Sequence, residues 1–383
     1  MAADRAWSAA CASGAGVTAV NAAIIGDCPT GLGTYAINVI NALDAAGERL
    51  LVYTSRTDGI MAPGAQVRSL PRALRPERGA LGHLLRLVWT QTALRAGLRR
   101  ARPDLLLNLM AEGVLGPDIP QVTVVHDVLP LRYPAEYPRQ RYYFRYYVPA
   151  VLRQSRAVVA SSESTRQDLV GFYGLPLDRV VVAPCGYDPG RFSPGHPEDG
   201  PGREPYALYV GNIMPHKNLL RLLEAFARAP RRLSRLVIRG SGRSRHVRAM
   251  RARIAALGLE SRIDWRPYAT AEELPGLYRE ARMLVLPSLA EGFGLPALEA
   301  LACGAPVITS NTSSLPEVVG DAALLVDPYD VEALAAAMAR VFEDDILVKE
   351  LRERGLARAA EFSWERTGRT VQAVLRGVRA AAL

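Results

Sequence analysis

The chain has 383 residues, of which 49% are hydrophobic and 22% charged, and its formal net charge is +9 at pH 7. These proportions are ordinary for a globular protein, and the length suffices for two α/β domains of roughly 150 residues each. No apolar run approaches the roughly 20 residues that span a bilayer, and there is no internal repeat or low-complexity tract, so we expect neither a transmembrane helix nor a solenoid.

The first 16 residues carry Arg5 but no apolar core. We therefore expect residues 1–16 to be a disordered N-terminal extension rather than a secretory signal. The cysteines lie far apart in the sequence and form no CxxC pair, which indicates reduced thiols in a cytoplasmic protein. They are Cys11, Cys28, Cys185 and Cys303.

Apolar runs alternate with helical patterns over residues 17–190, which predicts a doubly wound N-terminal domain. Serines at 161–164 are expected to cap the helix that follows them. The expected strands are Val17–Ile25, Leu50–Thr54, Asp104–Asn108, Val122–His126 and Ala157–Ala160, and the expected helices are Tyr35–Ala46 and Thr165–Tyr173.

Two features of this domain are candidates for ligand contact. Gly31 and Gly33 lie between the first strand and its helix, where a turn can expose N–H groups to an anion or simply shape the chain. His126 stands at the carboxyl end of a strand, where ligands of open α/β sheets bind, although a lone histidine is often structural. Asp127 either orients the imidazole or caps the next turn.

The positive charge is concentrated in residues 68–102, which contain nine arginines and the single acid Glu77. Within this segment Leu81, Leu84, Leu85, Val88 and Thr92 recur at helical spacing. Such a helix either packs on the domain core with a solvated arginine face, or lies on an anionic membrane or acceptor. No nucleic-acid-binding module is recognisable, so we expect no nucleic-acid partner.

Residues 191–204 lie in a stretch rich in proline and glycine and are the expected linker to a C-terminal domain over residues 205–362. That domain begins with the strand Tyr206–Val210, followed by Gly211 and Asn212. Lys217 is one of two lysines in an arginine-rich chain, which favours a point contact between its compact ammonium and a phosphate. A later strand, Leu236–Ile238, leads into another glycine loop that contains Gly240.

The most informative segment follows the expected strand Met283–Leu286. Gly294 permits a tight loop, and Pro296 fits the first position of a helix. The unpaired N–H groups at that helix start form a seat for phosphate. Glu291 precedes the seat and Glu299 follows it in the first turn, so two carboxylates could bind hydroxyls on either side of a diphosphate. The alternative is a surface loop whose acids cap a helix.

This segment resembles the Glu-x7-Glu motif of the retaining family-four glycosyltransferases, and the Phe-Ser-Trp sequence at 362–364 resembles the start of their last helix. The resemblance implies the GT-B fold: two Rossmann-like doubly wound domains facing a cleft, with a C-terminal helix, here residues 363–383, crossing back to the first domain. It also implies that Glu291 holds the donor hexose, Glu299 the ribose, and Lys217 the leaving diphosphate.

Asn212 stands near the position where many relatives carry an arginine, and His216 or a nearby arginine is the candidate replacement. The implied catalytic residues are His126, Lys217 and Glu291. The implied donor-binding residues are Gly31, Gly33, Gly211, Asn212, Gly240, Phe293, Gly294, Leu295 and Glu299. The acceptor-binding residues and the oligomeric state remain open.

The expected reaction is retaining, metal-independent transfer of a hexose from a nucleoside-diphosphate sugar to a hydroxyl of a saccharide, lipid-linked or natural-product acceptor. No Asp-x-Asp and no close histidine pair suggests a metal site, and no cofactor is expected. Residues 126–147 resemble bacterial polysaccharide mannosyltransferases, which favours GDP-mannose over the alternatives UDP-glucose, UDP-N-acetylglucosamine and a deoxysugar nucleotide. We expect a cytoplasmic enzyme, and the basic helix adds contact with the inner face of the membrane as an option. The alternatives are a glycosyl phosphorylase or sugar-nucleotide epimerase of the same fold, and a non-catalytic anion- or membrane-binding protein.

Overall fold

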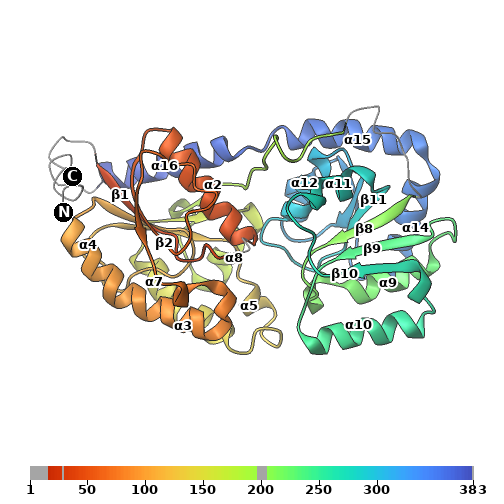
Figure 1. The fold of residues 1–383 in the computed structure, drawn as a ribbon, viewed down its shortest axis with the longest axis horizontal. Helices are drawn as coiled ribbons and strands as arrows, with labels where there is room; N and C mark the ends of the chain where they lie inside the picture. The colour runs from red at the N-terminus through yellow and green to blue at the C-terminus, as the bar shows by residue number, and fades with distance from the viewer. Residues whose placement is uncertain (1–15, 28–29, 196–204, 382–383) are drawn as a thin grey trace. The chain divides into compact units, whose positions relative to one another are not determined.

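The computed structural model describes residues 16–27, 30–195 and 205–381, which divide into two compact units (Figure 1). The first unit comprises Met1–Gly186 with Trp364–Leu383, and the second comprises Tyr187–Ser363. The expected N-terminal extension lies outside the described residues except for Gly16, and the expected linker 191–204 is described only as far as residue 195.

The first unit is built on a seven-stranded parallel sheet in the order β3-β2-β1-β4-β5-β6-β7. Its inner strands are apolar and buried along their whole length, as expected for a sheet covered by helices on both faces. The strands are β1 Val17–Asn21, β2 Arg49–Thr54, β3 Gln66–Ser69, β4 Leu105–Asn108, β5 Gln121–Val125, β6 Ala157–Ala160 and β7 Val180–Val182.

The α-helices of this unit are α2 Gly31–Ala45, α3 Gly79–Trp89, α4 Arg95–Ala101, α5 Leu129–Arg132, α6 Gln140–Tyr142, α7 Val148–Gln154, α8 Glu163–Tyr173 and α16 Trp364–Ala380. Single-turn 3-10 segments are η1 Arg72–Leu74, η2 Pro76–Arg78 and η5 Leu177–Arg179. Two π-helical turns, η3 Thr90–Leu94 and η4 Tyr143–Tyr147, join α3 to α4 and α6 to α7 into longer helices.

The second unit repeats the design with a six-stranded parallel sheet in the order β10-β9-β8-β11-β12-β13. Its strands are β8 Tyr206–Val210, β9 Arg235–Arg239, β10 Ile263–Arg266, β11 Met283–Leu286, β12 Val307–Ser310 and β13 Ala323–Val326. Its helices are α9 Leu219–Arg228, α10 Ser244–Ala256, α11 Glu273–Glu280, α12 Leu295–Ala302, α13 Leu315–Val319, α14 Val331–Glu343 and α15 Asp345–Ala359, with short turns η7 Pro215–Lys217 and η8 Glu260–Arg262.

The last helix, α16, belongs to the first unit although it follows the second in sequence. Gly368 makes its close approach to α2 possible, because a Cβ there would lie 2.4 Å from the Cβ of Ala42. The indole of Trp364 packs edge-on against the ring of Tyr35, with centroids 5.8 Å apart. The expected fold class, two Rossmann-like doubly wound domains with a C-terminal helix returning to the first, is confirmed.

Most expected elements are present within one or two residues, and three strands have the expected bounds: β6, β8 and β11. The predicted serine cap is confirmed, since Ser162 Oγ accepts a hydrogen bond from the Thr165 N–H at 3.1 Å. The first strand is shorter than expected. It ends at Asn21, after which Ala22–Ile25 form a buried turn.

The basic helix differs from the expectation in which side it buries. The expected apolar stripe is largely exposed, because Leu81, Leu84 and Val88 point away from the core. Of the expected stripe only Leu85 packs on the core, together with Trp89, which was not part of it. The inward position between them is taken by a guanidinium that is itself buried, and its charge is balanced by a buried carboxylate described below.

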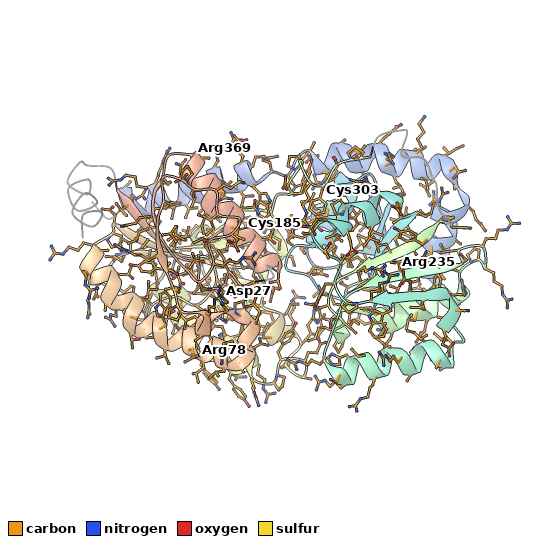
Figure 2. The ribbon with its side chains drawn as sticks, viewed as in Figure 1. Asp27, Arg78, Cys185, Arg235, Cys303 and Arg369 are labelled. Carbon is orange, nitrogen blue, oxygen red and sulfur yellow. The ribbon has the colours of Figure 1, made fainter. Side chains whose placement is uncertain are left out.

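Two expectations from composition can be compared with the structure. Cys185 and Cys303 carry free, buried thiols, one in each unit (Figure 2), whereas Cys11 and Cys28 lie outside the described residues. Among the residues that the structure describes, no helix combines the length and the apolar character needed to span a bilayer.

Candidate active site

The sheet of the second unit reverses its direction of growth between β8 and β11, and ligands of open α/β sheets bind at such a point. Lys217 follows β8 and Glu291 follows β11, so the two side chains meet there. The ammonium of Lys217 donates to both carboxylate oxygens of Glu291, at 2.7 and 2.6 Å. Two residues that the sequence singled out separately are therefore joined by charge-assisted hydrogen bonds.

The loop that carries Lys217 is fixed by the next residue. Asn218 adopts a left-handed conformation with φ of 62° and donates from its side-chain amide to the carbonyls of Pro287, at 3.0 Å, and Pro328, at 2.6 Å. These bonds tie the loop after β8 to the loops after β11 and β13. His216 has only 1% of its surface exposed, which argues against the ring as the expected replacement for a phosphate-binding arginine.

Serines hold Glu291, and sequence reasoning missed them. Ser288 Oγ donates to a carboxylate oxygen of Glu291 at 2.7 Å. Ser313, which has a positive φ of 59°, accepts from the Glu291 N–H at 3.1 Å and donates to its carbonyl at 2.7 Å. Ser314 donates to the carbonyl oxygens of Glu291 and Phe293. The glutamate is thus positioned by side chains that precede α12 and by others that precede α13.

Glu299 lies in α12, in the second turn rather than in the expected first, because the helix begins at Leu295 and Pro296 occupies its second position. Tyr278 donates its hydroxyl to Glu299 at 2.9 Å. Burial raises the pKa of Glu299 to about 7, against the opposite effect of the bond from Tyr278. Hydroxyl groups that donate to this carboxyl would stabilise its charged form and lower its pKa again.

The start of α12 offers fewer N–H groups to an anion than the sequence predicts, because Pro296 at its second position has none and the Ala297 N–H donates to the Gly294 carbonyl at 2.9 Å. Gly294 caps the helix with φ of 106°, a left-handed value that favours glycine, and a Cβ there would lie 2.9 Å from Leu315. Phe293 is buried and its ring packs against Phe362, so only its main chain can face a ligand. Leu295 then provides the first helical N–H.

Gly211 and Gly240 end adjacent strands, β8 and β9, and their loops touch. A Cβ on Gly240 would lie 1.8 Å from the Gly211 carbonyl oxygen, so this position requires glycine. Asn212, next in the chain, accepts from the hydroxyl of Tyr268 through its side-chain oxygen, which directs its NH2 group elsewhere. The structure therefore groups the candidates of the second unit at one edge of its sheet.

In the first unit, His126 follows β5 and is held by the main chain. Its Nε2 lies 3.1 Å from the Leu109 carbonyl, which can only accept, so Nε2 carries the proton and Nδ1 a lone pair. Its ring packs edge-on against Tyr35 at 4.7 Å. Burial lowers the pKa of His126 to about 4, so the imidazole is neutral at physiological pH. Asp127 accepts from the Leu129 N–H at 3.0 Å and so caps the next turn.

Gly31 and Gly33 lie in the first turn of α2, because this helix begins at Gly31, four residues before the expected start at Tyr35. Thr30 is the residue at the N-cap, and no side chain caps the helix there. The glycines thus contribute helical N–H groups rather than a preceding loop. They follow β1, which borders the point where the strand order of this sheet reverses.

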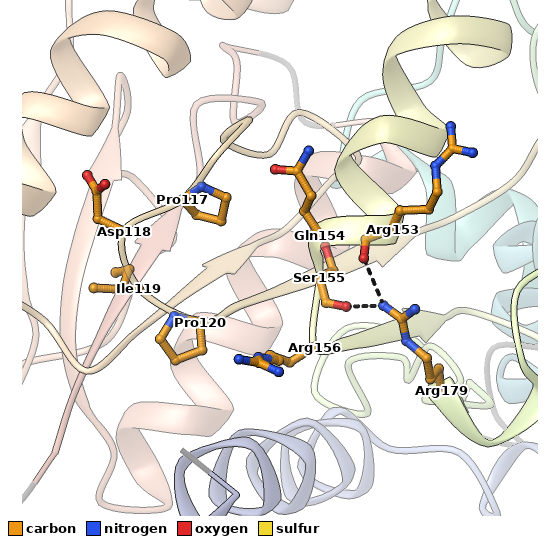
Figure 3. Close-up of a pocket in the computed structure, with 9 residues that line it drawn as sticks. All are labelled: Pro117, Asp118, Ile119, Pro120, Arg153, Gln154, Ser155, Arg156 and Arg179. Carbon is orange, nitrogen blue, oxygen red and sulfur yellow. Dashed lines mark hydrogen bonds between the residues drawn. The ribbon is translucent and has the colours of Figure 1, made fainter. Parts of the chain in front are cut away.

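A pocket of about 700 Å³ lies elsewhere in the first unit, where β5 begins and α7 ends, and contains none of the candidate residues (Figure 3). Arg179 at its wall donates to the carbonyls of Leu152, Arg153 and Ser155 at the end of α7. Its role there is structural. Across the described ranges, no three His, Cys, Asp or Glu side chains cluster in a way that could hold a metal ion.

Comparisons with known proteins identify the family of the chain. Residues 29–191 match the family described as Glycosyltransferase Family 4, and residues 196–358 match Glycosyl transferases group 1. The chain is 35% identical to the O-antigen chain mannosyltransferase B of Escherichia coli over 66% of this chain and 69% of that protein. It is 29% identical to a serotype-specific mannosyltransferase of the same species over 64% of this chain, a match that spans only 32% of that relative.

Solved structures show the same fold at low sequence identity. A sucrose-phosphate synthase from Thermosynechococcus elongatus superimposes with a TM-score of 0.78 at 22% identity, covering 96% of this chain and all of the other. An Anabaena protein in complex with UDP and glucose superimposes with a TM-score of 0.74 at 18% identity, covering 94% and 100%. These likenesses show the GT-B fold, and the two family matches with the 35% identical relative show that the chain belongs to the family-four glycosyltransferases.

Proposed function

We propose that this glycosyltransferase moves mannose from GDP-mannose to a hydroxyl of a saccharide acceptor, with retention of the anomeric configuration and without a metal ion. The named activities of the Escherichia coli relatives support mannose as the transferred hexose. The observation that carries the proposal is the hydrogen-bonded pair of Lys217 and Glu291 between β8 and β11.

Counting hydrogen-bonding groups supports the assignment of roles. An ammonium has three N–H donors, and Lys217 uses two on Glu291, so one remains for a phosphate oxygen. The carboxylate of Glu291 also accepts from Ser288, which leaves it about one further acceptor position for a sugar hydroxyl. Such a pair can bind a phosphate and a hydroxyl at the same time, which are the two groups adjacent to the scissile bond of a nucleotide sugar.

In the proposed reaction the bond from the anomeric carbon to the diphosphate breaks, and a bond to the acceptor oxygen forms on the same face. The acceptor proton passes to the leaving phosphate oxygen. Lys217 and the N-terminal N–H groups of α12 stabilise the negative charge that grows on the diphosphate. Because Glu291 is engaged by Lys217 and Ser288, we assign it to positioning the hexose rather than to nucleophilic attack.

The remaining candidates take supporting roles. Glu299 accepts from the ribose hydroxyls, and main-chain N–H groups near Gly294 bind phosphate. His126 offers Nδ1, an acceptor, to a hydroxyl of the donor sugar, and Gly31 and Gly33 offer N–H groups to the donor diphosphate or the acceptor. We further propose a cytoplasmic enzyme that works at the inner face of a membrane on a lipid-linked saccharide.

The test is a panel of GDP-, UDP-, ADP- and dTDP-sugars with the full-length protein, in the presence of EDTA. We expect GDP-mannose alone to raise the melting temperature and to be hydrolysed slowly. Product analysis by NMR with a mannosyl acceptor should show the α configuration of the donor. Stabilisation by a different nucleotide sugar would reassign the donor, and loss of turnover in EDTA would contradict metal independence.

A matched pair of variants ties the activity to the proposed site. Glu291→Gln should keep the fold and abolish hydrolysis, because the neutral amide cannot form the ion pair with Lys217 and offers one acceptor oxygen instead of two. Glu332→Gln removes a carboxylate from the surface of α14 and should leave hydrolysis unchanged. Equal activity of both variants would contradict the assignment of Glu291.

A further inference from the structure

Two helical segments of the first unit lie side by side: α3 with η3, and α6 with η4. The ring of His83 packs edge-on against that of Tyr143, with centroids 4.7 Å apart. Further along, Gln91 donates to the hydroxyl of Tyr147 at 2.6 Å. The two contacts occur in the same order along both segments, so the segments run in parallel.

The inner sides of both segments are occupied. Leu85 and Trp89 pack against one core cluster, and Phe144 packs against another. Arg86 is buried and donates to the buried carboxylate of Glu112 at 2.8 Å. These contacts fix the rotation of each segment, and with it the set of side chains that faces outward.

The outward side is apolar and aromatic. Leu81, Leu84 and Val88 are 52, 56 and 54% exposed, and their spacing of three and four residues places them in one row along α3. Tyr142 and Tyr146 are 52 and 65% exposed and stand one turn apart.

The row and the tyrosines share one surface. Residues 143 and 147 face α3, while 144 packs on the core. Helical periodicity then places 142 and 146 on the outer side next to the row. We call Leu81, Leu84, Val88, Tyr142 and Tyr146 the outer patch.

Within the two segments that carry the outer patch the charge has one sign, and Glu77 lies just outside the first of them. Residues 78–102 and 137–156 contain arginines and no aspartate or glutamate. The arginines are Arg78, Arg86, Arg95, Arg99, Arg100, Arg102, Arg139, Arg141, Arg145, Arg153 and Arg156. The guanidinium of Arg141 lies 4.7 Å from the centre of the Tyr142 ring, and that of Arg145 lies 5.9 Å from the centre of the Tyr146 ring. Not every arginine serves the patch, since Arg99 bonds Asp118 at 2.7 Å.

We propose that the outer patch docks on the surface of a lipid bilayer that contains anionic lipids. Leucine and valine side chains can enter the boundary between headgroups and acyl chains, tyrosine rings suit the headgroup level, and guanidinium groups bind lipid phosphates. A second copy of the chain fits less well, because two rims of arginine would face each other. The docking itself is independent of the donor and acceptor, and it rests on the proposed function only where it is taken to bring the enzyme to a lipid-linked acceptor.

The test is flotation of the full-length protein with vesicles of phosphatidylcholine alone, or of phosphatidylcholine with phosphatidylglycerol. We expect binding to the mixed vesicles only, weakened by salt. The triple variant L81Q/L84Q/V88Q should lower the partition coefficient on the order of 100-fold. The control M61Q/L177Q/I346Q replaces the same number of exposed apolar side chains elsewhere and should bind like the unchanged protein.

A second pair of variants tests the charge. R139Q/R145Q should weaken binding about fivefold for each arginine removed, whereas R354Q/R369Q should not. Thermal stabilisation by the nucleotide sugar should be equal in all variants, because they lie outside the donor site, so a failed docking proposal is distinguished from a failed donor assignment. Absence of binding to the mixed vesicles, or equal binding of the two triple variants, would overturn the proposal. Loss of a dimer in L81Q/L84Q/V88Q would assign the patch to a second copy instead.

Discussion

The second unit ends β8 and β11 in an ammonium and a carboxylate joined by two short hydrogen bonds. The first unit, built on the same kind of parallel sheet, follows β5 with an imidazole whose N–H donates to a main-chain carbonyl. One sheet edge therefore carries opposite charges that are held by serines and by Asn218, whereas the other carries a neutral ring held by the Leu109 carbonyl and the ring of Tyr35.

In the proposed reaction this difference divides the chemistry between the two units. A leaving diphosphate needs a fixed positive charge nearby, which is the role proposed for Lys217. A sugar hydroxyl needs a neutral acceptor or donor of defined direction, which is the role proposed for the partly buried His126. The same fold therefore supports two kinds of recognition, which are set by the side chains after the strands rather than by the strands themselves.

Removal of the ammonium should have the largest effect. Lys217→Ala should lower kcat/KM by about 10³-fold, because it deletes the positive charge that would stabilise the leaving diphosphate and leaves Glu291 without its partner. The measurement is single-turnover transfer with saturating acceptor. Lys349→Ala removes the other lysine of the chain, which is exposed on α15, and should leave the rate unchanged.

The pair should also behave as a unit. K217A/E291A should be little worse than either single variant, because each removes the same hydrogen-bonded arrangement. Independent effects that add in the double variant would show that the two side chains act separately. That result would break the contrast between a coupled site in one unit and a single ring in the other.

The second effect concerns stability at the donor edge. Gly240→Ala should lower the free energy of unfolding by about 3 kcal/mol, because its Cβ would meet the Gly211 carbonyl oxygen at 1.8 Å and force the two loops apart. Gly276→Ala in α11 meets nothing within 4 Å and should be neutral or slightly stabilising. Urea unfolding of both variants gives the comparison, and a small loss in Gly240→Ala would show that the loops can relax.

The third prediction concerns the neutral ring. The pKa of His126 falls from 6.5 to about 4 on folding, so the unfolded chain binds the extra proton. His126 should therefore add stability that is complete above pH 6.5 and is lost as the pH falls toward 4, by at most about 3 kcal/mol. His126→Asn should flatten that part of the stability profile measured by urea unfolding. An unchanged profile would mean that the pKa of His126 does not shift on folding.

The sequence was sufficient for the alternation of strands and helices and for the residues at strand ends, because both depend on local pattern. Glu291 and Lys217 were found in this way, and the structure brings them together. Sequence could not find Ser313 or Asn218, whose roles depend on left-handed backbone and on contacts between distant loops. It also assigned Leu81, Leu84 and Val88 to one apolar stripe without showing that Arg86 and Glu112 take the buried side, because a buried ion pair reverses the ordinary rule for charge.

Glu299 should give the smallest effect, with the opposite sign to His126. Its pKa rises from 4.5 to about 7 through burial, so the folded state binds the extra proton. The stability that this proton adds is present below pH 4.5 and is lost as the pH rises through 7. Glu299→Gln should remove that loss and should weaken donor binding about tenfold at pH 8, where the carboxylate would accept from ribose.

Between pH 6 and 8 the donor affinity of the unchanged protein should rise as Glu299 loses its proton, and that of Glu299→Gln should stay level. Isothermal titration at several pH values measures both, and His126→Asn serves as the control because its ring is already neutral in this range. A rise that survives in Glu299→Gln would place the titrating group elsewhere. The stability of the protein should change with pH in opposite directions through His126 and Glu299, and each change should be absent from the variant of that residue. Each unit would then have its own ionisable group, and only Glu299 in the second unit would link protonation to donor binding.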